Sequence, residues 1–132
     1  MYHYSKKSQS MIETVCPELK SLLAEAIKYV DVTILEGHRT KTRQEELVKT
    51  GKSKTMNSKH CFYPSKAVDI AISPIDWDNR ERFFFLGGLM TALAAKHGIK
   101  IRWGGDWNGK GLFNTDFPKE KRFDDLVHFE LL

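Results

Sequence analysis

A short alternating segment, residues 67–72, places one carboxylate inside an otherwise apolar strand. Val68, Ile70 and Ile72 would share one face of this strand, and Asp69 would lie on the other face between two alanines. A buried carboxylate without a partner is costly to remove from water. We therefore expect the fold to bring a polar or charged partner to the face that carries Asp69.

Residues 125–131, near the end of the chain, alternate in the same way. The two expected faces are Val127, Phe129 and Leu131 on one side and Leu126, His128 and Glu130 on the other. If this strand lies beside 67–72 in one sheet, then His60, Asp69 and His128 could converge. Two imidazoles and one carboxylate are a zinc-binding set that leaves one coordination position open for water, as catalytic sites require.

These residues also carry a resemblance to a known family. Three motifs in this order resemble the signature of the D-alanyl-D-alanine carboxypeptidase (VanY-like) zinc peptidases: Ser58-x-His60, Ala67-x-Asp69 and Asp125-x-x-His128. Within that family the chain is most similar to short phage endolysins that cut the L-alanyl-D-glutamate bond of peptidoglycan. The similarity covers nearly the whole chain and includes Gly37-His38-Arg39-Thr40, Gly104-Gly105-Asp106-Trp107-Asn108 and His128-Phe129-Glu130-Leu131.

The resemblance implies a fold, a metal and a function. The fold would be α+β, a small antiparallel sheet with a zinc site on one face and helices packed on the other, as in hedgehog and D-alanyl-D-alanine peptidase domains. His60, Asp69 and His128 would hold Zn²⁺, and residues 1–132 would form a single catalytic domain without a separate wall-binding domain. The function would be zinc-dependent hydrolysis of peptidoglycan stem peptides by a phage endolysin that lyses the host cell wall.

Two further residues take chemical roles from this resemblance. Asp125 matches the acidic residue that serves as general acid and base, although its neighbour Asp124 is a rival for that role. Arg39 matches a basic residue that binds the substrate carboxylate or polarises the scissile carbonyl, for which a bidentate guanidinium is suited. A surface arginine is the alternative for Arg39.

Three other residues near these motifs, Ser58, Glu130 and Cys61, each allow two interpretations. Ser58 either orients the ligand His60 through a hydrogen bond or simply forms a turn. Glu130 either orients a ligand or touches substrate, or is a plain edge-strand carboxylate. Cys61 is either an additional ligand or a packed thiol, and Gln44 is expected on a helix surface.

The chain departs from the family pattern at one place. The step from His60 to Asp69 is nine positions, where the family usually has seven. The extra residues fall around 62–64, so we expect a two-residue insertion in the loop before the strand. It would alter the substrate cleft more than the metal site.

The remaining patterns predict the other elements. These are two helices within 8–30 split by Pro17 near Cys16, a strand at 32–36, a helix from Thr40 or Thr42 through Lys49, a core helix at 80–97 closed by Gly98, a strand at 99–103 and a long loop from Gly104 to Arg122.

Composition narrows the class of protein. The chain has 41% hydrophobic and 29% charged residues, which excludes a disordered chain. We expect no signal peptide and no membrane partner, so a wall hydrolase would wait in the host cytoplasm for help such as a holin. The net charge of +4 fits an anionic wall polymer or nucleic acid, and charge alone does not choose between them. The basic residues are scattered and form no stripe interleaved with aromatic residues of the nucleic-acid-binding kind. We expect a monomer that acts on bacterial peptidoglycan and does not bind nucleic acid.

Three alternative functions stay open from the sequence. The first is a D,D-carboxypeptidase or dipeptidase of bacterial cell-wall metabolism, which would use the same residues. The second is a zinc-containing binding module without turnover, and the third is a basic nucleic-acid-binding domain indifferent to chelators. Asp125 speaks against the second, because a structural zinc site has no use for a proton shuttle.

Overall fold

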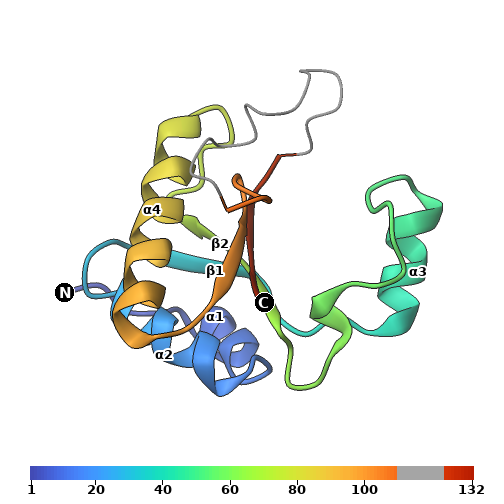
Figure 1. Ribbon diagram of the computed structural model, residues 1–132, viewed down its shortest axis with the longest axis horizontal. Coiled ribbons are helices and arrows are strands. Elements are labelled where there is room, and N and C mark those ends of the chain that lie inside the picture. Colours follow the sequence, from blue (N-terminus) through green and yellow to red (C-terminus); the bar gives the residue numbers. More distant parts are fainter. Residues whose placement is uncertain (110–123) are drawn as a thin grey trace.

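A computed structural model describes residues 1–109 and 124–132 (Figure 1). The elements in chain order are α1 (Lys6–Ile12), α2 (Pro17–Ala26), β1 (Val32–Glu36), α3 (Lys41–Lys49), the 3₁₀ turn η1 (Lys59–Cys61), β2 (Ala67–Ile72), α4 (Arg80–His97), β3 (Ile101–Gly104) and β4 (Asp125–Leu131). None of the helices described is long and apolar enough to cross a bilayer.

The strands form one antiparallel sheet in the order β1-β2-β4-β3. β2 and β4, far apart in sequence, are therefore neighbours. Their register sets Asp69 directly opposite His128. This pairing confirms the expected side-by-side arrangement and supplies Asp69 with the partner that its strand required.

The apolar face of the sheet is covered by α2 and α4, as predicted. Ile34, Ile70 and Phe129 on this face are at most 3% exposed and pack with Leu23 and Met90 of the two helices. α3 does not join this layer and stands across from the opposite face (Figure 1). The fold is therefore the expected α+β arrangement, with one helix left on the side of the proposed metal site.

Local sequence signals explain where the helices begin and end. Pro17 occupies the first turn of α2, where its missing N–H costs no hydrogen bond, and it separates α2 from α1 as predicted. Thr40 caps α3 by accepting a hydrogen bond from the amide of Arg43. Gly98 ends α4 in the left-handed conformation, with φ 68°.

Two predicted boundaries differ from the structure or fall outside it. β3 begins at Ile101, two residues later than expected, because the chain needs residues 98–100 to leave α4. Of the long loop expected from Gly104 to Arg122, residues 110–123 lie outside the described part of the chain.

The sheet register is interrupted twice. In β1 one residue, Leu35, is extra, so that Glu36 pairs with Asp69. Between β3 and β4, Trp103 pairs with Phe129 but the next residue, Gly104, pairs with Asp125. The expected face of Leu126 is therefore wrong: it packs with the hydrophobic core, on the side opposite His128.

Candidate metal centre and active site

Three side chains from two strands and one turn converge on a single point. Asp69 Oδ1 lies 3.1 Å from His60 Nε2 and 3.1 Å from His128 Nδ1. One ligand atom from each of the three residues lies within 4.8 Å of the other two. The structure therefore brings together the three predicted ligands in a cluster that a single metal ion could bridge.

The remaining ring nitrogens are engaged by groups that fix the orientation of each imidazole. His60 donates its Nδ1 proton to the carbonyl of Gly37 at 2.7 Å, and His128 Nε2 donates to Glu130 Oε1 at 2.8 Å. Such outer hydrogen bonds turn the opposite nitrogen toward a metal. Glu130 thus lies where the ligand-orienting alternative requires, and it is held there by Lys59 Nζ at 3.3 Å.

The electrostatics of the cluster favour a charged Asp69 and a charged His128 in the metal-free protein. Burial opposes ionisation of Asp69, but hydrogen bonds from His128 and His60 outweigh it and hold its pKa well below the usual range. Burial also opposes protonation of His128, yet the hydrogen bonds to Asp69 and Glu130 raise its pKa to about 9. A cation bound here would replace this proton as the counter-charge.

Asp125 lies in the same cleft, without belonging to the three-residue cluster. It lines the cleft together with His60, Asp69 and His128. Burial, reinforced by the negative charge of Asp69, raises the pKa of the Asp125 carboxyl. Its rival Asp124 is exposed and paired with Arg80 Nη2 at 3.2 Å, so the two neighbours occupy different environments.

Arg39 is held at the edge of the cluster by two side chains that the sequence analysis did not single out for a role. Glu36 accepts from Arg39 Nε at 2.8 Å and from Nη2 at 2.6 Å, and Gln44 accepts from Nη1 at 2.8 Å. Arg39 Nη2 also lies 3.9 Å from Asp69 Oδ2. The side chain of Arg39 is only 10% exposed, so Arg39 is not a surface arginine.

The expected surface position of Gln44 is wrong, because its side chain is fully buried. Besides Arg39, it contacts the loop after α3, donating to Ser53 Oγ at 2.9 Å and to the carbonyl of Thr55 at 2.6 Å. Gln44 ties that loop to the cleft.

The segment before β2 accommodates the longer spacing between His60 and Asp69. Ser58 Oγ accepts from the amide of His60, which is the turn-forming alternative. Phe62 and Tyr63 are exposed, while His60 stays 1% exposed beside Asp69. The residues around 62–64 therefore lie at the surface, away from the three-residue cluster, and Cys61 lies outside the donor set.

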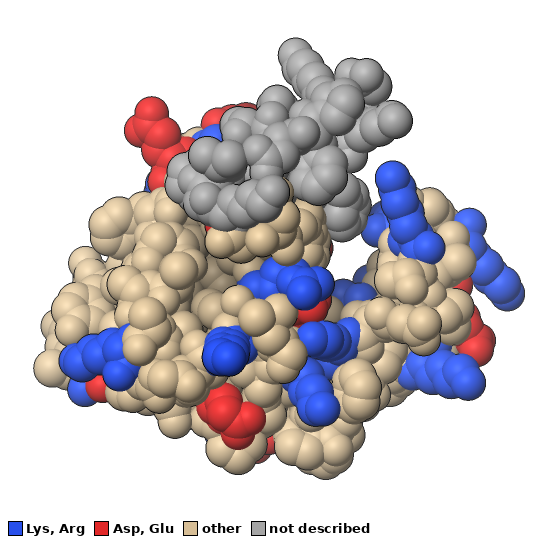
Figure 2. All heavy atoms as spheres, viewed as in Figure 1, with Lys and Arg blue, Asp and Glu red and all other residues tan. Residues whose placement is uncertain are grey.

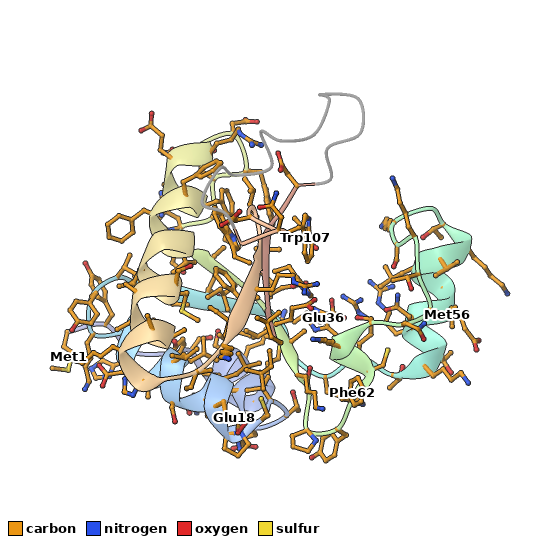
Figure 3. All side chains as sticks on the ribbon, in the orientation of Figure 1. Met1, Glu18, Glu36, Met56, Phe62 and Trp107 are labelled. Carbon is orange, nitrogen blue, oxygen red and sulfur yellow. The ribbon has the colours of Figure 1, made fainter. Side chains whose placement is uncertain are left out.

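The cleft is bounded by the sheet on one side and by α3 and its following loop on the other. It has a volume of about 470 Å³ and is lined by lysines 52, 54 and 59 beside the acidic and histidine side chains. Figure 2 shows Lys and Arg side chains on both sides of the hollow between the sheet and α3. In Figure 3, Trp107 lies above and Glu36 below the side chains that point from the sheet toward α3.

Several lining residues were missed by sequence reasoning. Regular alternation along β1 would place Glu36 on the core face. The extra residue Leu35 reverses this, and nothing in the local sequence pattern signals that bulge. Lys59 adjoins His60 and could have been suspected from that position. Trp107 enters the sequence analysis only as part of a family-like motif, and its ring centroid lies 5.6 Å from that of His128.

Comparison with known proteins agrees with this geometry. A family model described as phage L-alanyl-D-glutamate peptidase matches residues 1–132. The chain is similar to the L-alanyl-D-glutamate peptidase of Escherichia phage T5, with 28% identity over 124 residues, covering 89% of this chain and 90% of that protein. It is also similar to the crystal structure of the Serratia marcescens L-Ala D-Glu endopeptidase ChiX, with a TM-score of 0.76 and 26% identity over 98% of this chain and 90% of that one.

Proposed function

Because this chain belongs to the phage L-alanyl-D-glutamate peptidase family, we propose that it is a zinc-dependent endopeptidase that hydrolyses the L-alanyl-D-glutamate bond of peptidoglycan stem peptides. The observation that supports this most directly is the convergence of His60, Asp69 and His128 beside Asp125 in one cleft. Peptidoglycan is the proposed partner of a monomeric, single-domain enzyme that does not bind nucleic acid.

The donor set fits zinc. Two imidazole nitrogens and one carboxylate oxygen are ligands that zinc accepts, and three protein ligands leave a position for water or substrate. The chemistry that a bound zinc ion supplies is Lewis acidity, which acidifies water and polarises a peptide carbonyl. Gly37 and Glu130 accept the outer protons of His60 and His128 and keep the inner nitrogens aimed at the ion.

Asp125 is the proposed general acid and base. Its raised pKa lets the carboxyl hold a proton closer to neutral pH than an exposed aspartate does. Its carboxylate would accept the proton of the attacking water and then donate it to the nitrogen of the leaving D-glutamate. This role requires Asp125 to face the cleft without being tied up as a ligand.

Arg39 is the proposed substrate-binding residue. Three of its five N–H groups are used by Glu36 and Gln44, which fix the plane of the guanidinium at the cleft wall. A carboxylate or carbonyl oxygen of the stem peptide would bind to the same plane.

The proposed endopeptidase would act from the host cytoplasm after a holin, or a similar factor, gives it access to the wall.

Turnover of purified peptidoglycan, with mass analysis of the new amino termini, tests the proposal. Wild-type protein should expose D-glutamate amino groups, chelation should abolish this, and zinc should restore it. Asp125→Ala should bind zinc but lose roughly 100- to 10,000-fold in kcat. Asp124→Ala is the matched control and should retain activity.

Other products would point elsewhere. Release of D-alanine alone would assign a carboxypeptidase, and zinc binding without any cleavage would reduce the protein to a binding module. Cleavage that survives complete chelation would refute the metal-dependent reaction.

A further inference from the structure

Asp125 faces the cleft because the ladder between β3 and β4 is interrupted. Trp103 and Gly104 are adjacent in β3, whereas their partners Phe129 and Asp125 are separated by residues 126–128 in β4. In an unbroken strand, Asp125 would lie on the same face as Phe129, which is the core face. The extra residues reverse this and leave the carboxyl in the cleft.

Gly104 is the residue that permits this close approach of the strands. A Cβ atom at this position would lie 1.9 Å from the carbonyl oxygen of Asp125 and 2.7 Å from its carbonyl carbon. The clashing atoms belong to the backbone, so a side-chain rotation cannot relieve the overlap. Any larger residue at position 104 must displace the backbone of Asp125 itself.

Trp103 contacts the interrupted part of β4 from the core side of the sheet. Its indole Nε1–H donates to the carbonyl of Leu126 at 2.8 Å, and Leu126 belongs to the extra segment, residues 126–128. The ring is held by stacking on Phe129 and by two glycines, since a Cβ at Gly87 or Gly105 would lie within 2.6 Å of it. The extra segment is thus anchored to α4 through the buried indole.

We propose that Gly104 and Trp103 are positioning residues that set the carboxyl of Asp125 in the cleft through this interruption of β4. The proposal rests on the proposed function for its kinetic consequence, because Asp125 acts there as the proton carrier. Neither residue lines the cleft, and neither belongs to the cluster of His60, Asp69 and His128.

The kinetic test is a double-mutant cycle on a soluble stem peptide. Gly104→Ala should lower kcat roughly 100-fold, because small displacements of a reacting group have effects of that size, while KM and zinc affinity change less than about twofold. In the Asp125→Ala background the same substitution should cause no further loss. Gly88→Ala is the matched control, because a Cβ there meets no atom within 4 Å.

Trp103→Phe provides a second variant in case Gly104→Ala does not fold. It keeps an aromatic ring and removes the N–H that Leu126 accepts, so it should also lower kcat and also lose its effect when Asp125 is absent. The proposal is overturned if Gly104→Ala behaves like Gly88→Ala, or if the loss persists undiminished in the Asp125→Ala background.

Hydrogen exchange of the Trp103 indole separates this proposal from the proposed function. The indole proton should be protected in the wild type and in Gly88→Ala, and should exchange much faster in folded Gly104→Ala. If the wild type cuts no stem peptide, the proposed function fails. The exchange rates then still show whether Gly104 holds the extra segment, and with it Asp125, in place. Equal protection in all three proteins would show that Gly104 does not hold the segment.

Discussion

At the scale of single residues, the cleft depends on side chains whose partners fix their orientation. His60 and His128 each use one ring nitrogen for an outer acceptor and turn the other toward Asp69. Arg39 is similarly fixed by Glu36 and Gln44. Because every one of these contacts restricts rotation, the chemical groups are arranged before any ligand binds.

Replacing Glu130 by Gln should weaken zinc binding about 10- to 100-fold, which is the usual cost of losing such an outer partner. The amide is nearly the same size but carries no negative charge to stabilise the Nε2–H of His128. Competition with a fluorescent zinc chelator measures the change. Glu46→Gln, on the exposed face of α3, is the control, and equal affinities for the two variants would contradict the orienting role of Glu130.

Zinc binding should release protons and strengthen as pH rises from about 6 to about 8, because His128 must lose a proton to bind. Its folded-state pKa of about 9 lies above the unfolded value. Protonation of His128 therefore stabilises the metal-free fold below about pH 6.5, and this contribution is lost as pH rises through about 9.

Calorimetry of zinc binding in two buffers with different ionisation enthalpies measures the released protons. The apparent heat should differ between the buffers, and Glu130→Gln should release fewer protons than the wild type. Identical heats in both buffers would show that His128 is already neutral before zinc binds.

At the scale of elements, the two register interruptions decide what lies in the cleft. The extra Leu35 in β1 sets Glu36 opposite Asp69, and the extra segment in β4 turns Asp125 to the same side. Each interruption places a carboxylate in the cleft, whereas regular alternation would place it on the core face. α3 and the loop after it form the facing wall, and Gln44 joins them to Arg39 at the edge of the cluster.

Gln44→Leu should lower the free energy of unfolding by about 1–3 kcal/mol, because it leaves the buried side chain of Arg39 without an acceptor at Nη1. It also removes the hydrogen bonds from Gln44 to Ser53 Oγ and to the carbonyl of Thr55. Urea unfolding gives the stability, and limited proteolysis should cut the loop at 52–57 faster in the variant. Glu45→Ala, an exposed neighbour on α3, should stay within about 0.5 kcal/mol of the wild type; similar losses for both variants would remove any special role for Gln44.

At the scale of the whole molecule, the cluster of His60, Asp69 and His128 joins parts of the chain that are distant in sequence. His60 comes from the turn before β2, Asp69 from β2 and His128 from β4, while the core under the sheet is built from α2 and α4. A bound ion would add a cross-link on the face opposite that core. Metal binding and folding should therefore be coupled.

Zinc should raise the melting temperature, since free zinc at 100 times its Kd stabilises the folded state by about 2.7 kcal/mol. His60→Ala should abolish most of the zinc-dependent shift, whereas His97→Ala, on α4, should preserve it. Thermal melts with added zinc and with chelator provide the comparison. A shift that survives in His60→Ala would place the bound zinc elsewhere.

The sequence by itself determined most of the helices and strands and indicated which residues meet in the cleft. Periodicity located both alternating strands and α4, and local signals such as Pro17, Thr40 and Gly98 marked where helices begin or end. The alternation of the two strands, together with the resemblance to a peptidase family, predicted that His60, Asp69 and His128 converge, and the structure brings them together. These features are readable because they depend on residues close together in the chain or on a recurring motif.

Only the tertiary structure decided how Glu36, Gln44, Leu126 and Asp125 are oriented. Each depends on a register or a packing contact between distant segments: Leu35 adds a residue against β2, Gly104 lets β3 approach Asp125, and Gln44 is buried by the loop it binds. A one-residue change of register reverses the face of every following side chain. Such a change is settled by pairing energies across the sheet, which the order of residues along one strand does not contain.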